Sequence, residues 1–307
     1  MRFMAVTVRD RFQGALLGLE LLPVALRLGG GRPIALAACS EEASRRSLLC
    51  RAIDCSLART SDFLTAPNVW RMALTRLPSA AFLIPACVPV LLRYHYCWQS
   101  RLRWLMWLED WIENERVFES ADGERLSDWE GAIAQVLMLG DVLERMGAEL
   151  SFEDWLFWLE GCAERYSDIP FVCGQYEGIL LALTGTQSGL GTGEFTKMNA
   201  HQVFAAGLWS AIASSGNYAL TVRSLGECAF AREMSCLEDE SFDVLIDDAL
   251  KADWVAAFSA GLVAGALSGR NTLPVLWQVR LPASRRADLA DELFRRWAGQ
   301  SLGRGVF

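Results

Sequence analysis

The sequence predicts an all-α protein that folds as a single compact multi-helix domain. Most segments repeat apolar residues three and four positions apart, which places them on one face of an α-helix. No two segments alternate apolar and polar residues with the period of two that paired strands require. The 307 residues also contain no linker rich in Ser, Pro or Gly longer than about ten residues. We therefore expect one domain over residues 1–307.

Composition narrows the possible functions. Hydrophobic residues make up 52% of the chain and charged residues 21%, which suits a large core and argues against disorder. The nine cysteines form no CxxC pair and lie in apolar surroundings, as expected of buried reduced thiols. No N-terminal signal pattern is present, so we expect a cytoplasmic protein. The net charge is −8 and no basic cluster stands apart, so nothing supports nucleic acid binding.

Capping residues, glycines and prolines set the expected helix limits. The expected helices span residues 9–28, 40–59, 67–76, 79–92, 93–114, 127–146, 151–166, 171–184, 199–214, 219–233, 241–250, 254–269 and 284–298. Ser127 and Ser151 each open a capping box. Pro23 must kink or end the first helix. The glycine-rich stretch 185–193 is expected to be a flexible connection, because a phosphate-binding loop needs a preceding strand and a Lys-Ser/Thr pair.

The segment from Trp254 to Gly269 is the expected core helix. It carries no charge, and Gly261, Gly265 and Gly269 fall on one helical face together with Ala257. Because each glycine costs a helix roughly 1 kcal/mol relative to alanine, their presence indicates close approach of a neighbouring backbone. The uncharged run is too short to cross a membrane comfortably, so we expect no membrane span.

Trp104, Trp107 and Trp111 form an aromatic stripe at helical spacing. A stripe of this kind serves a core, a contact with another subunit or a ligand platform. The first two are the simpler interpretations. If a protein partner exists, these three tryptophans are its candidate contact.

Two segments resemble the ADP-ribosylglycohydrolase family. The first is D-R-F-Q-G-A-L-L-G-L at residues 10–19, which is similar to the family's opening helix. The second is A-G-L-V-A-G-A-L-S-G…L-P-V-L-W at residues 260–277, which is similar to its closing helix and the turn after it. Asn271 also resembles an asparagine of some cyanobacterial-type members. The resemblance implies a compact helix bundle with a binuclear magnesium site that cleaves the glycosidic bond between ADP-ribose and a protein side chain.

The resemblance also implies three acidic motifs, and the first two are altered here. A Gly-Asp is expected where this chain has Leu22 and Pro23, and Glu20 is the only acid nearby. A Thr-Asp-Asp-Thr is expected at a later helix start. Its nearest counterpart is Glu41 and Glu42, which also have the simpler role of favouring a helix N-terminus.

The third motif should lead directly into the closing helix. Aligning the glycines puts Ala252 and Trp254 at the two aspartate positions and Val255 at the threonine position. Asp253 remains between them, one residue out of phase. Mg²⁺ prefers carboxylate, hydroxyl and water oxygens. A site that has lost this many carboxylates is not expected to hold two metal ions.

Three hypotheses follow for the function. The first is a non-catalytic, ADP-ribosylglycohydrolase-like pseudoenzyme that acts as a binding or scaffold protein and needs no cofactor. The second is a divergent hydrolase that still uses Mg²⁺, with Glu41, Glu42 and Asp253 as candidate ligands and catalytic residues. The third is a subunit-contact protein that uses the tryptophan stripe.

The two histidines suggest no further site. His95 lies two residues before Cys97, but two ligands do not make a zinc site. A hydrogen-bonded histidine at a helix boundary is the expected role of His95. A Cys–His nucleophile pair that involves His201 stays open, because sequence does not reveal spatial proximity.

Overall fold

The computed structural model describes residues 6–27, 80–115, 126–148, 150–189, 200–225 and 248–273, and near the C-terminus residues 288, 290–295 and 298. Within these ranges the chain forms helices joined by turns, with no strand. The predicted all-α fold is therefore confirmed for the described part of the chain. The expected helices at 40–59 and 67–76 lie outside it.

The described ranges contain α-helices and two short 3-10 turns. In chain order they are α1 (Val8–Arg27), the 3-10 turn η3 (Ala80–Phe82), α4 (Leu83–Arg93), α5 (Trp98–Glu115), α6 (Leu126–Glu144), α7 (Phe152–Glu164), α8 (Pro170–Gly189), α9 (Ala200–Ala213), α10 (Tyr218–Leu225), α12 (Asp248–Ser268) and the 3-10 turn η6 (Arg270–Thr272).

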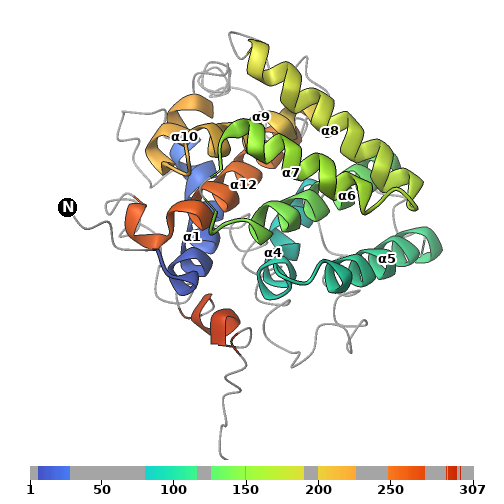
Figure 1. Cartoon of the computed structure of the whole chain (residues 1–307), viewed down its shortest axis with the longest axis horizontal. Helices are drawn as coiled ribbons and strands as arrows, with labels where there is room; N and C mark the ends of the chain where they lie inside the picture. The colour runs from blue at the N-terminus through green and yellow to red at the C-terminus, as the bar shows by residue number, and fades with distance from the viewer. Residues whose placement is uncertain are drawn as a thin grey trace, which may run out of the picture.

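Helix α12 runs through the middle of the bundle. It packs against α1 along one side and against α9 and α10 on another, while α6 joins α4, α5 and α8 into the remaining part (Figure 1). Every residue from 256 to 266 is buried. The expectation of a buried core helix is confirmed, and no helix among the described residues is long and apolar enough to cross a membrane.

The limits of α12 differ from the prediction at one end only. The helix begins at Asp248, so residues 248–250 form its first turn and do not end a separate helix. Ala249, Leu250 and Ala252 are strong helix formers, which allows the helix to extend past Asp253. At the other end Gly269 has φ +75°, as expected for a glycine that terminates a helix. Arg11 then donates to the final carbonyls of Ala266 and Leu267, at 3.2 and 2.9 Å.

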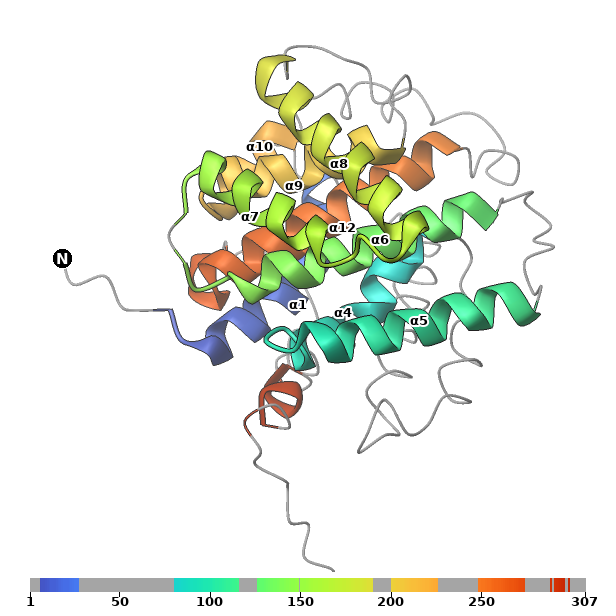
Figure 2. The same ribbon diagram turned by 45° about the vertical axis from the view of Figure 1, so that its right-hand side comes forward.

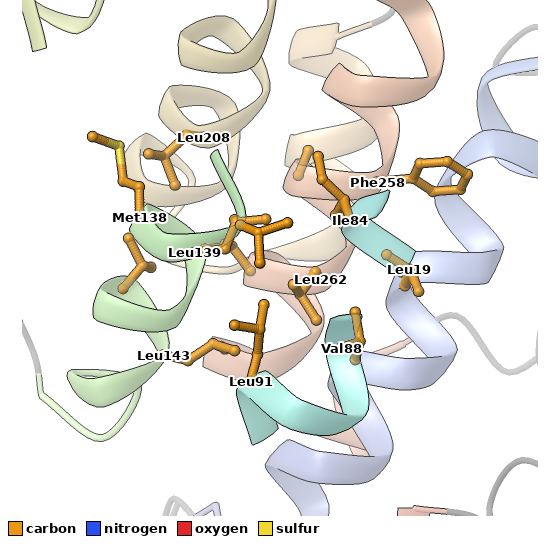
Figure 3. Packing of buried hydrophobic residues seen from close by; sticks show 14 of the residues in the cluster. Leu19, Ile84, Val88, Leu91, Met138, Leu139, Leu143, Leu208, Phe258 and Leu262 are labelled. Atoms are coloured by element: carbon orange, nitrogen blue, oxygen red, sulfur yellow. The ribbon is translucent and has the colours of Figure 1, made fainter. Parts of the chain in front are cut away.

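The core is one continuous apolar cluster. Side chains from α1, α4, α6, α9 and α12 meet in its centre (Figure 3), including Leu19, Ile84, Leu139, Leu208 and Phe258. Because five helices contribute to one cluster, the described helices form one packing unit.

Local signals predicted some helix limits correctly and missed others. The capping box of Ser151 and Asp154 is present, with the Ser151 hydroxyl accepting from the Asp154 amide at 3.1 Å. The first expected helix, 9–28, is found as Val8–Arg27, so Pro23 lies inside α1 and does not end it. The expected loop at 185–193 is wrong for its first half, because α8 continues to Gly189. Each added helical residue gains a backbone hydrogen bond, and a single glycine costs only about 1 kcal/mol.

Candidate functional site

Glycines bring the backbones of α1 and α12 into direct contact. A Cβ placed on Gly14 would lie 2.1 Å from the carbonyl oxygen of Gly265, and one on Gly18 would lie 2.3 Å from that of Gly261. Both atoms belong to the opposite backbone, so no larger residue fits unless the helices move apart. The predicted reason for the glycine face is therefore confirmed.

The same contacts fix how the two helices run. Gly14 faces Gly265 and Gly18 faces Gly261, so the helices are antiparallel and lie side by side (Figure 2). Leu22 continues the register, with its Cβ 3.0 Å from the Cβ position of Gly261. Moving toward the C-terminal end of α1 thus means moving toward the N-terminal end of α12. Residues 22–23 and 252–254 therefore lie toward the same end of the pair.

The backbones of Pro23, Ala252 and Trp254, the positions expected to be acidic, lie within helices. Pro23 is in the last turns of α1, and residues 252–254 are inside α12 and not in a loop before it. The side chains of these residues and of Asp253 lie outside the described part of the structure, and so do Glu41 and Glu42 entirely. Among the side chains that are described, no group of three or more His, Cys, Asp or Glu could hold a metal ion.

A second candidate is an ion pair buried in the bundle. Arg101 of α5 is 1% exposed and Asp141 of α6 is 0% exposed. The Nη2 of Arg101 lies 2.6 Å from Oδ1 of Asp141 and 2.8 Å from Oε2 of Glu144. Removing two charges from water is costly, so such a pair persists only with further hydrogen bonds.

Those further bonds come from three neighbouring segments. The hydroxyl of Tyr166 donates to Asp141 at 3.0 Å, and the hydroxyl of Tyr176 on α8 donates to the same carboxylate. Nη1 of Arg101 donates to the carbonyl oxygen of Tyr94 at 2.9 Å and to that of His95. The cluster therefore ties the end of α4 to α5, α6 and α8.

Gly140 makes room for this cluster. A Cβ on Gly140 would lie 2.7 Å from Cδ and 2.8 Å from Nε of Arg101. Since the guanidinium is held by Asp141, Glu144 and two backbone carbonyls, a side chain at position 140 would displace a buried cation. The glycine is thus a packing requirement of the ion pair.

Burial and neighbouring charges shift the pKa values of Asp141 and Arg101 in opposite directions. Burial raises the pKa of Asp141, while Arg101 and the Tyr176 hydroxyl oppose that rise by stabilising the carboxylate. Burial alone would lower the pKa of Arg101, but Asp141 and Glu144 raise it above the usual arginine value. With donors already on both carboxylate oxygens, Asp141 is not available to a substrate. The cluster is a structural anchor and not an active site.

His95 adds a neutral polar group beside this cluster. It is buried in the turn between α4 and α5, and its Nδ1 lies 2.6 Å from the carbonyl oxygen of Leu92. Because a carbonyl only accepts, Nδ1 carries the proton. Burial lowers the pKa of His95 to about 4. The expected hydrogen-bonded histidine at a helix boundary is confirmed.

The tryptophan stripe is divided between the core and the surface of α5. Trp104 is 3% exposed and belongs to the core, while Trp107 is partly buried against it. The side chain of Trp111 lies outside the described part. Trp104 is therefore not available to a partner, and it fulfils the core role that the stripe also predicted.

The cysteines only partly match their expected burial. Four of them are described and all four are free thiols, with Cys87 and Cys162 buried and Cys97 and Cys173 partly exposed. No described contact joins one of these sulfurs to His201. The Cys–His alternative gains no support from these four.

Sequence reasoning missed the Arg101 cluster. A signal for it exists, because Asp141 interrupts the otherwise apolar run from Val136 to Leu143 and a charge at such a position must be paired. The partner could not be identified from the sequence, because Arg101 is separated from Asp141 by 40 residues.

Comparison with models of protein families finds no match for this chain. Comparison with curated proteins likewise finds no similar protein. Function must therefore be argued from the residues and from the geometry of the described helices.

Proposed function

We propose that this chain is a non-catalytic binding or scaffold protein built on an ADP-ribosylglycohydrolase-like helix bundle. One observation carries the proposal. The two segments that resemble the family's opening and closing helices are the two whose backbones touch, at Gly14 with Gly265 and at Gly18 with Gly261. The contact brings together the two segments that carry the resemblance, although most of the chain separates them.

The same helix pair supports the loss of hydrolase chemistry. In the resembling family the acidic motifs flank these helices, and here Leu22, Pro23, Ala252 and Trp254 stand at the matching positions. None of these side chains offers the oxygen ligands that Mg²⁺ prefers. The residues do not fit a binuclear magnesium site, and we derive no hydrolytic step from them.

Calorimetric titration tests the proposal. ADP-ribose is titrated into the protein in about 5 mM Mg²⁺, a concentration chosen to saturate a weak magnesium site. The same titration is repeated in EDTA. We expect no heat of ADP-ribose binding that depends on Mg²⁺. Tight ADP-ribose binding that needs Mg²⁺ would contradict the proposal.

A double variant tests the rival hypothesis that the protein is a divergent hydrolase. If the protein is a divergent hydrolase, it should release ADP-ribose from modified arginine or serine, and Glu41→Gln with Glu42→Gln should abolish that release. If turnover occurs and the double variant leaves it unchanged, those two glutamates are not the ligands. If no turnover occurs in the wild type, the non-catalytic proposal stands.

A further inference from the structure

We propose that the outer face of α7 is a docking surface for a basic amphipathic helix of a partner protein. We define this face by Glu153, Phe157, Glu160, Gly161 and Glu164, all of which are exposed. Helix α7 lies on the outside of the bundle in both ribbon views (Figures 1 and 2). The inference goes beyond the proposed function and does not depend on the family resemblance.

Phe157 is the apolar centre of this face. Its side chain is 79% exposed, whereas Trp155 and Leu159 on the opposite side of the same helix are buried. Successive positions 153, 157, 160, 161 and 164 fall within one arc of the helix at 3.6 residues per turn. An exposed phenylalanine alone is ordinary. Its surroundings are what distinguish it.

Carboxylates surround Phe157. Glu153, Glu160 and Glu164 share its arc, and within the described part of the chain none of the three forms an ion pair. Like charges three or four residues apart destabilise a helix by roughly 0.2–0.5 kcal/mol per pair. Arg165, the residue after Glu164, does not pair with these glutamates, because its guanidinium lies 3.5 Å from Glu144 and 4.7 Å from the centre of the Trp158 ring.

Gly161 lies one turn from Phe157 and has no packing role among the described helices. A Cβ added to it would meet nothing within 4 Å, in contrast to Gly14 and Gly265, where the opposite backbone is in the way. A helical glycine costs about 1 kcal/mol relative to alanine, and no contact among the described residues accounts for this cost at Gly161 or, on α8, at Gly174. A partner helix approaching at Gly161 would explain it, with Phe157 as the neighbouring anchor.

The negative charge of the α7 face limits which partners can bind it. A second copy of the same face would oppose carboxylate to carboxylate, and nucleic acid or an anionic membrane would be repelled as well. A helix with Lys or Arg beside an apolar stripe complements both the glutamates and the ring. The occupant is therefore a basic amphipathic helix.

A defined peptide tests this surface. The probe is a fluorescein-labelled 18-residue helix of Leu and Lys in amphipathic order, long enough to cover the four turns or so of α7. Its control carries Glu in place of Lys. Fluorescence anisotropy should show binding of the Lys peptide that weakens as salt rises, and no binding of the Glu peptide.

Variants locate the binding on α7. Phe157→Ala should weaken binding about tenfold or more, as truncation of an aromatic anchor does. Glu160→Gln with Glu164→Gln should weaken it and reduce its salt dependence. Leu220→Ala on α10 removes another exposed apolar side chain, 50% exposed, and should change nothing. All of these side chains are exposed, so the variants should keep the circular dichroism of the wild type.

Several results would overturn the inference. They are failure of the wild type to bind the Lys peptide, equal binding of the Lys and Glu peptides, and equal effects of Phe157→Ala and Leu220→Ala. Self-association that Phe157→Ala abolishes would assign the face to a second copy instead. None of these outcomes bears on magnesium or ADP-ribose binding, so this inference and the proposed function fail separately.

Discussion

Substituting alanine for glycine should have opposite effects at two positions of this protein. At Gly265 the new Cβ would lie 2.0 Å from the carbonyl oxygen of Gly14 and 2.6 Å from its carbonyl carbon. At Gly161 the new Cβ would meet nothing within 4 Å. The two substitutions are chemically identical and both are helical, so only the packing differs.

The expected change in stability follows from the overlap between the new Cβ at position 265 and the backbone of Gly14. Ordinary contact begins near 3.4 Å, so Gly265→Ala must separate α1 and α12 locally by about 1.4 Å. Overpacking of this kind costs about 1–3 kcal/mol or more, and a gap of ~1 Å elsewhere along the pair forfeits up to about half of its dispersion energy. Alanine returns about 1 kcal/mol of helix propensity. Because the clash is with backbone atoms, we take the upper end of the overpacking range and expect a net loss of about 2 kcal/mol at Gly265 and a gain of up to about 1 kcal/mol at Gly161.

Urea unfolding followed by circular dichroism measures both effects. The transition midpoint should fall for Gly265→Ala and rise for Gly161→Ala, with the slope of the transition unchanged. Equal stability of Gly265→Ala and the wild type would refute the close approach of α1 and α12. A loss of stability for Gly161→Ala would refute the open surroundings of α7.

Two further predictions concern the buried polar groups. Arg101→Met should lower the free energy of unfolding by about 3–5 kcal/mol, because it leaves Asp141 buried without its cation. Adding Asp141→Leu should restore part of the loss. If the double variant is no more stable than Arg101→Met, the ion pair is not the cause. His95 has a pKa lowered to about 4 by burial, whereas an unfolded-state histidine titrates near 6.5, so its contribution is complete above about pH 6.5 and is lost as the pH falls toward 4. The pH dependence of unfolding should therefore be shallower in His95→Gln by about 3 kcal/mol across this interval, and identical profiles would contradict a neutral buried histidine.

The sequence predicted the helices and the glycine face because both are periodic. Three- and four-residue spacing of apolar residues is a local property, and so is the row of Gly261, Gly265 and Gly269. The spacing did not reveal which helix the glycines meet. It also did not distinguish Gly161, which faces open space, from Gly14, which faces a backbone.

The pairing of Arg101 with Asp141 could not be predicted from the sequence for a different reason. Arg101 and Asp141 come from separate helices, and their pairing depends on how α5 and α6 pack. A local pattern shows that a charge interrupts an apolar run, but not whether a partner reaches it. The start of α12 was missed on similar grounds, since helix formation continues past Asp253 whenever the flanking residues favour it.

We propose that α1 and α12 form an ADP-ribosylglycohydrolase-like helix pair that lacks the metal site. A crystal structure of the protein with Mn²⁺ and ADP-ribose, with anomalous scattering recorded for manganese, tests both the helix contact and the absence of the metal site. We predict that α1 and α12 lie in backbone contact at Gly14 and Gly265, with no manganese beside Pro23, Ala252 or Trp254. Two manganese ions at that end of the helix pair, held by carboxylates such as Asp253, Glu41 or Glu42, would contradict the account.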